Sequence, residues 1–347
     1  MTEEEKNEHN QARLRPACLG GIAILLVAVV AAVLSLWAFG AIYYDGPIGR
    51  GTGNLVLGLA WAVVMLVLVF RAKTLAKRFL VWLACFALVW ASWLYIPASN
   101  DRDWQQEWSR TAWAEVGDDG DTITIHNFRN FDYARDGSVT ERWETRTVRL
   151  SNLQGIDLFL DAFGGENWAH PMLSYDFGPD GRVLISIETR REKSEKFSQI
   201  GGLYKMFELQ YLIGEERDFV RVRTNIRNEP MYLYSGRFQP ERGRETFLAT
   251  VRELNSLKET PKYYNVITHN CTTSYRAQRP PEERHKWDIR ILINGKLDEL
   301  LYERGAFITE GLSFPELRKQ AMINETAMDA HHDPEFSERI REGLVGF

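Results

Sequence analysis

Three long stretches near the N-terminus of this 347-residue chain contain no charged side chain. They cover residues 18–44, 54–70 and 79–96. A helix needs roughly 17–25 mainly apolar residues to cross the hydrocarbon core of a bilayer. The first stretch is too long for the apolar core of a signal peptide, and two more follow it. We therefore predict a membrane region of three transmembrane helices over residues 1–97 and a second domain over residues 98–347.

The basic residues near these stretches predict the orientation of the chain. The loop at residues 71–78 carries two arginines and two lysines, whereas the loop at residues 45–53 carries only Arg50. Basic loops remain on the cytoplasmic side of a membrane. The N-terminus and the 71–78 loop are then cytoplasmic, and residues 98–347 are periplasmic in a Gram-negative cell. This pattern is typical of a multi-pass protein of the bacterial inner membrane.

A second feature is the segment NVITHNCTT, which contains Cys271. The other two cysteines, Cys18 and Cys85, fall in the apolar stretches, so Cys271 has no partner within the chain in an oxidising compartment. Such a thiol either pairs between chains or is kept for its reactivity. The alternative is a buried cysteine that packs as a small apolar residue.

The residues before Cys271 predict a helix that begins at this cysteine. Asn270 and Thr268 are both of a type that caps helix N-termini. The positive end of a helix dipole favours the thiolate form of a cysteine, which is its nucleophilic form. Cys271 is therefore a candidate nucleophile, and Asn270 is a candidate for contact with a substrate beside it.

A β-hairpin is predicted at residues 171–177 and 182–189, joined by the turn GPDG. Its apolar residues alternate at odd positions, so both strands bury the same face only if odd positions pair with odd ones. His170 and Glu188 then share the opposite face, as a candidate general base and the group that orients it. If the helix at Cys271 packs over that face, His170 lies within reach of the thiol. The alternative is a solvent-exposed polar face, and His269 is a competing base.

The remaining chain predicts an α+β fold with an antiparallel sheet packed by the cysteine-bearing helix. Residues 101–115 are expected to form an amphipathic connector, and a helix is expected after Pro240. Alternating apolar residues predict four further strands, at 122–128, 140–150, 218–226 and 231–238.

Several classes of function are disfavoured by the sequence. No HExxH or CxxC spacing is present, so neither a metal nor another cofactor is predicted. A net charge of −5 without a basic stripe argues against binding nucleic acid.

Four segments, HPMLSYDF, ISIETRRE, GGLYKMFELQYLIGEERDFVRVRTN and NCTT, occur in this order over roughly residues 100–345. Together they resemble the Lnb N-terminal periplasmic domain family, which is associated with N-acylation of bacterial lipoproteins and looks like permuted papain-like enzymes. The resemblance implies that Cys271 is the nucleophile, His170 the base and Glu188 its orienter. It also implies that Arg190 and Arg129 are framework residues or contact the headgroup.

The resemblance thus implies a cysteine acyltransferase that takes an acyl chain from a membrane phospholipid through a thioester. The expected acceptor is an amine, in particular the N-terminal cysteine of a lipoprotein. One difference from the family pattern is that the membrane segments here precede the catalytic domain rather than follow it. Two alternatives remain open, a periplasmic cysteine amidase or peptidase and a membrane-anchored binding protein without activity.

Overall fold

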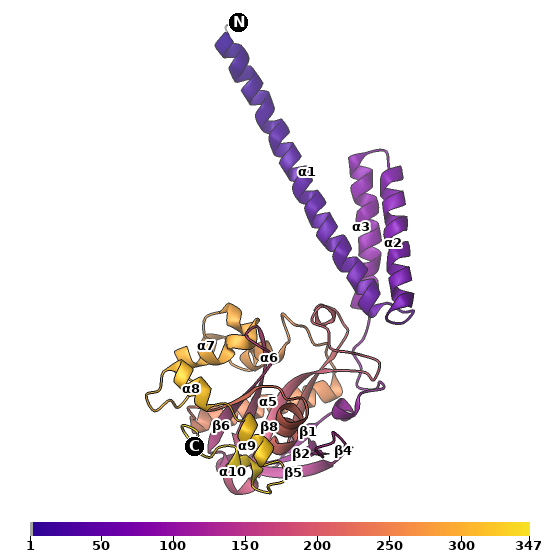
Figure 1. Cartoon of the computed structure of the whole chain (residues 1–347). Coiled ribbons are helices and arrows are strands. Elements are labelled where there is room, and N and C mark those ends of the chain that lie inside the picture. Colours follow the sequence, from indigo (N-terminus) through magenta and orange to yellow (C-terminus); the bar gives the residue numbers. More distant parts are fainter. Residues whose placement is uncertain (1–2) are drawn as a thin grey trace. The chain divides into compact units, whose positions relative to one another are not determined.

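The computed structural model describes residues 3–347, with side chains from residue 21 onward, and divides them into two compact units (Figure 1). One unit comprises the chain up to Pro97 together with Tyr204–Met206. The other comprises Ala98–Leu203 and Phe207–Phe347. The expected α+β architecture, with three apolar helices ahead of a sheet domain, is confirmed.

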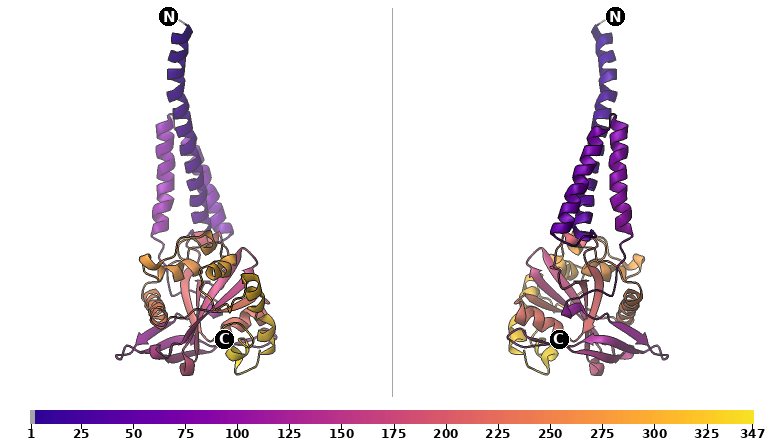
Figure 2. Two further views of the ribbon diagram at one scale, coloured as in Figure 1. Left: turned by 90° about the vertical axis from the view of Figure 1, so that its left-hand side faces the viewer. Right: turned by 90° about the vertical axis from the view of Figure 1, so that its right-hand side faces the viewer.

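The first unit consists of α1 (Glu3–Asp45), α2 (Thr52–Arg71) and α3 (Leu75–Leu94). Helix α1 extends well beyond the ends of the other two (Figure 2). All three helices are long and apolar enough to cross a membrane, from Gly21 in the case of α1. Large apolar side chains point outward, and Leu36 and Phe70 are 72% and 71% exposed. Such a surface is stable in lipid but not in water, so the chain is a membrane protein.

The segment Tyr204–Met206 belongs to this helical unit although it lies far along the chain. The carboxylate of Asp45 accepts hydrogen bonds from the indole of Trp93 at 2.7 Å and from the backbone N–H of Lys205 at 3.0 Å. Tyr204 packs so closely on α1 that a Cβ atom at Gly40 would lie 1.9 Å from its hydroxyl oxygen. A larger residue than glycine at position 40 therefore requires the Tyr204 ring to move.

The second unit is built on one eight-stranded sheet in the order β1-β2-β9-β8-β7-β6-β10, with β5 paired to β2. All pairs are antiparallel except a short parallel contact between β2 and β9. The strands are β1 (Trp113–Val116), β2 (Thr122–Arg129), β5 (Trp143–Arg149), β6 (Gly155–Gly164), β7 (Trp168–Asp176), β8 (Arg182–Arg190), β9 (Glu208–Gly214) and β10 (Met231–Ser235), and a separate pair is β3 (Asp132–Tyr133) and β4 (Val139–Thr140).

Both faces of this sheet are covered by helices. On one face, Met172 and Leu184 join an apolar cluster with residues of α4 (Glu216–Arg221), α9 (Asn324–Asp329) and α10 (Phe336–Arg339). On the other face, the ring of Tyr175 meets that of Phe247 at 5.1 Å. The helices on this second face are α5 (Pro240–Glu259), α6 (Cys271–Ala277), α7 (Leu297–Glu303) and α8 (Phe314–Gln320). The polar face of the hairpin is therefore buried, not exposed.

Two predicted elements are wrong. Residues 218–226 form helix α4 and a π-helical turn, Val222–Ile226, instead of a strand. The alternation of valine and arginine resembles a strand, but Arg221 and Arg223 are both buried because each pairs with carboxylates. Residues 101–115 form a short 3₁₀ turn, Gln106–Trp108, and part of β1 instead of an amphipathic connector.

Candidate active site

The β7–β8 hairpin opens at one end, and this opening creates a pocket in the second unit. Leu173 pairs with Ile185, so the predicted odd-to-odd register is confirmed. The last pair toward the open end is Met172 with Ser186. Beyond it, β7 continues along β6 and β8 continues along β9, so the two hairpin strands separate. The pocket between them has a volume of about 440 Å³.

Helix α6 begins at Cys271, as predicted, because Asn270 caps it. The side-chain oxygen of Asn270 accepts a hydrogen bond from the backbone N–H of Thr273 at 2.7 Å. The hydroxyl of Thr273 in turn accepts one from the backbone N–H of Asn270 at 2.9 Å. This reciprocal arrangement fixes the first helical turn. The thiol of Cys271 is 6% exposed and lines the pocket, as does Asn270, whose side chain is used to hold the helix.

The prediction that helix α6 packs over the polar face of the hairpin is wrong. Thr272 and Tyr275 line an apolar pocket together with Leu173, which lies on the odd-numbered face. Cys271 still meets His170 because the two hairpin strands have separated at this level. The N-terminus of α6 therefore reaches the polar residues through the opening rather than across the face.

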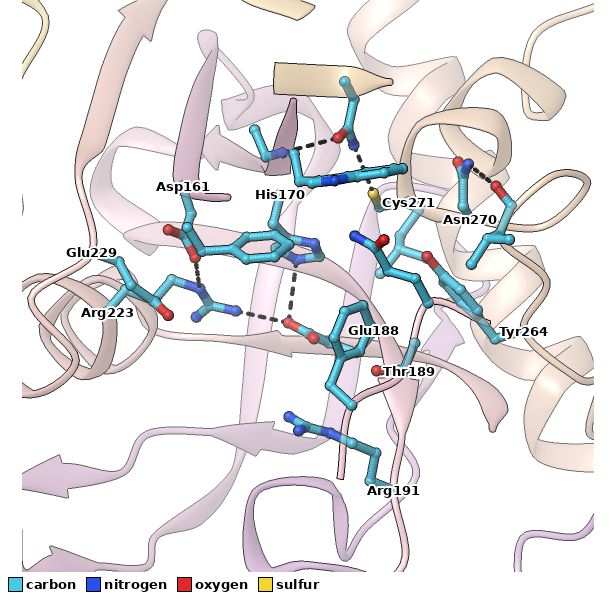
Figure 3. A pocket seen from close by; sticks show the side chains of 18 of the residues that line it. Asp161, His170, Glu188, Thr189, Arg191, Arg223, Glu229, Tyr264, Asn270 and Cys271 are labelled. Atoms are coloured by element: carbon cyan, nitrogen blue, oxygen red, sulfur yellow. Dashed lines mark hydrogen bonds and ion pairs between the residues drawn. The ribbon is translucent and has the colours of Figure 1, made fainter. Parts of the chain in front are cut away.

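His170 lies between the thiol and Glu188 (Figure 3). Its Nε2 atom is 2.7 Å from the hydroxyl of Ser186 and 3.3 Å from Oε1 of Glu188. Ser186 also donates to Glu188 at 2.6 Å. These contacts occupy Nε2, so Nδ1 is the ring nitrogen that remains available to Cys271, which lines the same pocket.

The charges around His170 favour its protonated form. Burial lowers the pKa of His170, but the charge of Glu188 and the hydrogen bonds with Cys271 and Glu188 raise it to about 10. Burial raises the pKa of Glu188, but the charges of His170 and Arg223 hold it well below its ordinary value. The pair is thus an imidazolium next to a carboxylate at neutral pH.

Arg223 holds Glu188 from behind and was not identified from the sequence. Its Nη2 atom donates to Glu188 at 2.8 Å, and its Nε atom is 3.2 Å from a carboxylate oxygen of Asp161. Glu229 lies beside Asp161, and burial together with the charge of Asp161 raises the pKa of Glu229 to about 7. Figure 3 shows these groups as one polar row that ends at His170.

Asn294 is another site residue that the sequence analysis missed. Its side-chain oxygen accepts a hydrogen bond from the backbone N–H of Ala169 at 2.9 Å. Its amide nitrogen lies 3.5 Å from the sulfur of Cys271 and 3.2 Å from the hydroxyl of Thr272. Asn294 therefore links the strand that carries His170 to the helix that carries the thiol.

Arg129 and Arg190, predicted as framework residues or headgroup contacts, do not line the pocket. The Nε and Nη2 atoms of Arg129 donate to the buried carboxylate of Asp218, at 2.9 and 2.8 Å. Arg190 donates to the backbone carbonyls of Trp108 and Ser109. Each guanidinium is buried and engaged by the fold, so the geometry supports a framework role for both.

The competing histidine does not reach the thiol pocket. His269 is exposed, and its ring contacts the hydroxyl of Thr268 at 2.8 Å. Among the described residues, His170 is the histidine that lines the pocket with Cys271. No group of three or more potential metal ligands occurs in the described part of the chain.

The pocket is lined by apolar side chains as well as by the polar residues next to His170. Phe163 and Phe197 are 44% and 43% exposed, and their ring centroids lie 6.3 Å apart. Trp168 and Val266 also line the pocket, as do charged residues such as Arg191 and Arg227. The site can therefore accommodate a ligand that has both an apolar and a charged part.

Comparison with known proteins gives one match. The family model of the Lnb N-terminal periplasmic domain matches residues 139–283, a range that includes His170, Glu188 and Cys271. No curated protein and no solved structure matches the chain significantly. The resemblance noted in the sequence is thereby confirmed. The chain is a membrane protein whose residues 139–283 match the Lnb N-terminal periplasmic domain.

Proposed function

We propose that the protein is a cysteine acyltransferase that moves an acyl chain from a phospholipid to an amine. The observation that carries this proposal is the placement of His170 between Cys271 and Glu188 at an open pocket. A nucleophile, a base within hydrogen-bond reach and a group that orients the base are the parts that covalent catalysis requires.

In the first step, His170 holds the proton of the thiol as an imidazolium, and the sulfur of Cys271 attacks an ester carbonyl of the phospholipid. The C–O bond of the ester then breaks, and the lysophospholipid leaves with the proton held by His170. An acyl thioester remains on Cys271. The side-chain amide of Asn294, 3.5 Å from the sulfur, is a suitable donor to the oxyanion that forms.

In the second step, an amine attacks the thioester carbonyl. The new C–N bond forms, the C–S bond breaks, and the amine proton passes to His170, which restores the imidazolium beside the freed sulfur. The acceptor that fits best is the α-amino group of a lipoprotein's N-terminal cysteine. Both substrates are then confined to the bilayer, which suits an enzyme with three membrane-spanning helices.

The proposed location is the bacterial inner membrane, with a multi-pass topology. The excess of basic residues in the 71–78 loop supports a cytoplasmic position for that loop and a periplasmic position for residues from 98 onward. An alkaline phosphatase fused after residue 150 is expected to be active in intact cells. An inactive fusion there, with an active one in the 71–78 loop, would reverse the topology.

A cysteine amidase or peptidase is a second candidate, and the charged pocket wall favours it. Glu107 and Arg227 are the kind of side chains that hold a polar peptide or sugar-peptide substrate, and both line the pocket. The same nucleophile and base would serve that reaction.

The two candidates are separated by intact-mass measurement of the full-length protein after incubation with phospholipid vesicles. Acyl transfer predicts a fatty-acyl adduct on Cys271 that hydroxylamine removes, and the amine acceptor should discharge it. Cys85, which lies in α3, serves as an internal control and should remain unmodified. A thiol that never acylates would eliminate the acyltransferase.

A further inference from the structure

The pocket contains an arginine whose charge is not neutralised by a neighbouring carboxylate. The guanidinium of Arg191 makes no hydrogen bond or ion pair with the residues that the structure describes, and its Nε atom is buried. The other two arginines of the pocket differ in this respect. Arg223 pairs with Glu188 and Asp161, and Arg227 pairs with Glu107 at 2.9 Å.

Trp108 supplies a second donor without an acceptor in the same pocket wall. Its indole Nε1 atom is buried and has no hydrogen-bond partner among the described residues, and the side chain is only 3% exposed. The guanidinium of Arg191 lies over the Trp108 ring, 4.1 Å from its centroid. This stacking fixes the plane of the guanidinium without using its N–H groups.

Two N–H donors without partners in one pocket wall indicate that an acceptor from outside the chain binds there. A buried donor without a partner is unfavourable, and more so when it is charged. Burial also lowers the pKa of Arg191 by more than the charges of Glu188 and Glu107 raise it. Guanidinium groups bind phosphate through two parallel N–H···O bonds, and an oxyanion fits this wall better than a neutral group.

We propose that Arg191 and Trp108 form an anion subsite that holds the phosphate of the acyl donor while its ester lies at Cys271. This inference rests on the proposed acyltransferase function and assigns the part of the substrate that it recognises. Arg191 acts here as a specificity residue: it distinguishes a phospholipid from an uncharged acyl ester. The chemistry of the subsite is that of phosphate in general, so a free phosphate ion is the other source to be tested.

The main test compares two acyl donors with the same chains, phosphatidylglycerol and diacylglycerol, in mixed micelles with the full-length protein. The rate of Cys271 acylation is followed by mass spectrometry. In the wild type, phosphatidylglycerol should react faster. Arg191→Ala should slow the reaction with phosphatidylglycerol roughly 10- to 100-fold and leave that with diacylglycerol nearly unchanged, because only the phospholipid loses a charge-assisted contact. Arg191→Lys should retain part of the preference.

Arg252→Ala is the matched control, because Arg252 is an exposed arginine on α5 outside this pocket. It removes the same charge and should leave the ratio of the two rates unchanged. An equal fall with both donors after Arg191→Ala, or no fall with either, would overturn the subsite.

If neither lipid acylates Cys271, the acyltransferase proposal is refuted. A second experiment then tests the anion subsite by itself. Binding of inorganic phosphate to the full-length protein is then measured by isothermal titration. Phosphate binding that Arg191→Ala abolishes and Arg252→Ala preserves would retain the anion subsite with a soluble phosphate as its ligand. Equal binding by both variants, or none by the wild type, would refute the subsite.

Discussion

Buried networks of arginine and carboxylate side chains lie beside both ends of the β7–β8 hairpin. The two ends differ in what surrounds these networks. At the turn end, Arg341 binds the carboxylates of Asp157 and Glu216, at 2.8 and 2.6 Å for its Nη2 atom. At the other end, Arg223 binds Glu188 and Asp161 in the same way. The cavity at the turn end, lined by Asp176 and Arg182, has no cysteine or histidine in its wall, whereas the other end opens to a 440 Å³ pocket with a thiol and unpartnered donors.

This difference shows that buried charge does not by itself mark an active site. Both networks desolvate carboxylates and arginines, and both pair them closely. Only the open end leaves a nucleophile and a histidine accessible to a ligand. Substitutions at the turn end are therefore expected to change stability alone, and substitutions at the open end to change activity.

Cys271→Ala should have the largest effect on the open end. Removal of the nucleophile is expected to reduce acyl transfer by at least about 10⁴-fold, because loss of a nucleophile in comparable hydrolases has effects of that size or larger. Steady-state turnover in mixed micelles measures the loss, and the unfolding transition should be unchanged. Cys85→Ala serves as the control and should keep full activity. Normal turnover by Cys271→Ala would refute every thiol mechanism.

Arg341→Met should have the largest effect on the turn end. The substitution leaves Glu216 buried without its cation and Asp157 with only the longer contact to Arg182 at 3.4 Å, so the free energy of unfolding should fall by about 3–5 kcal/mol. Urea unfolding of the detergent-solubilised protein measures this. Arg339→Ala, which breaks an exposed ion pair nearby, is the control and should have no measurable effect. A reduced turnover per folded molecule in Arg341→Met would contradict the division between the two ends.

Glu188→Gln should have a smaller effect on activity, with a change in pH dependence. We expect a loss of roughly 10- to 100-fold, because one charge-assisted hydrogen bond is weakened, and a greater loss for His170→Ala. The pKa of His170 is raised from its ordinary 6.5 to about 10, and Glu188 is the main cause of the increase. The alkaline limb of kcat/KM, which reports loss of the imidazolium proton, should therefore move from near pH 10 to lower pH in Glu188→Gln.

The same pKa change predicts how stability depends on pH. Because folding raises the pKa of His170, its stabilising contribution is complete below about pH 6.5 and is lost as the pH rises through about 10. Urea unfolding at a series of pH values should show this loss in the wild type and a smaller one in Glu188→Gln. An unchanged alkaline limb and an unchanged pH dependence of stability would show that Glu188 does not control His170.

Ser186→Ala should have the smallest effect. The Ser186 hydroxyl lies between His170 and Glu188, but these two residues also approach each other directly at 3.3 Å. A loss of activity of only a few fold is expected, on the scale of one neutral hydrogen bond. Steady-state kcat is the measurement, with Ser256→Ala on α5, outside this pocket, as control. A loss as large as that of Glu188→Gln would make Ser186 the essential link to His170.

Features that depend on local pattern could be predicted from the sequence. The three apolar helices follow from length and composition, the hairpin register from alternation, and the start of α6 from the cap at Asn270. These features are set by residues near one another in the chain. His170, Glu188 and Cys271 were accessible to sequence reasoning because each lies at the end of such an element.

Features that depend on distant partners could not be predicted in this way. Asn294 reaches the thiol from a turn 23 residues further along the chain. Arg190 and Arg191 are adjacent in sequence. The guanidinium of Arg190 donates to backbone carbonyls, whereas Arg191 lines the pocket. No residue-type pattern distinguishes them, because the difference arises from where Trp108 and its neighbours fold back. The two arginines chosen from the sequence were for this reason framework residues.

The helical unit is completed by a piece of chain that the ribosome makes much later. Tyr204, Lys205 and Met206 belong to this unit, and the amine of Lys205 donates to the carbonyls of Trp93 and Ile96. During synthesis, the first three helices enter the membrane before these partners exist. A truncated protein that begins at Ala98 also lacks the groups that these three residues contact. The boundary at Pro97 is therefore a poor place to cut, and soluble fragments that start there should aggregate more readily than the whole chain.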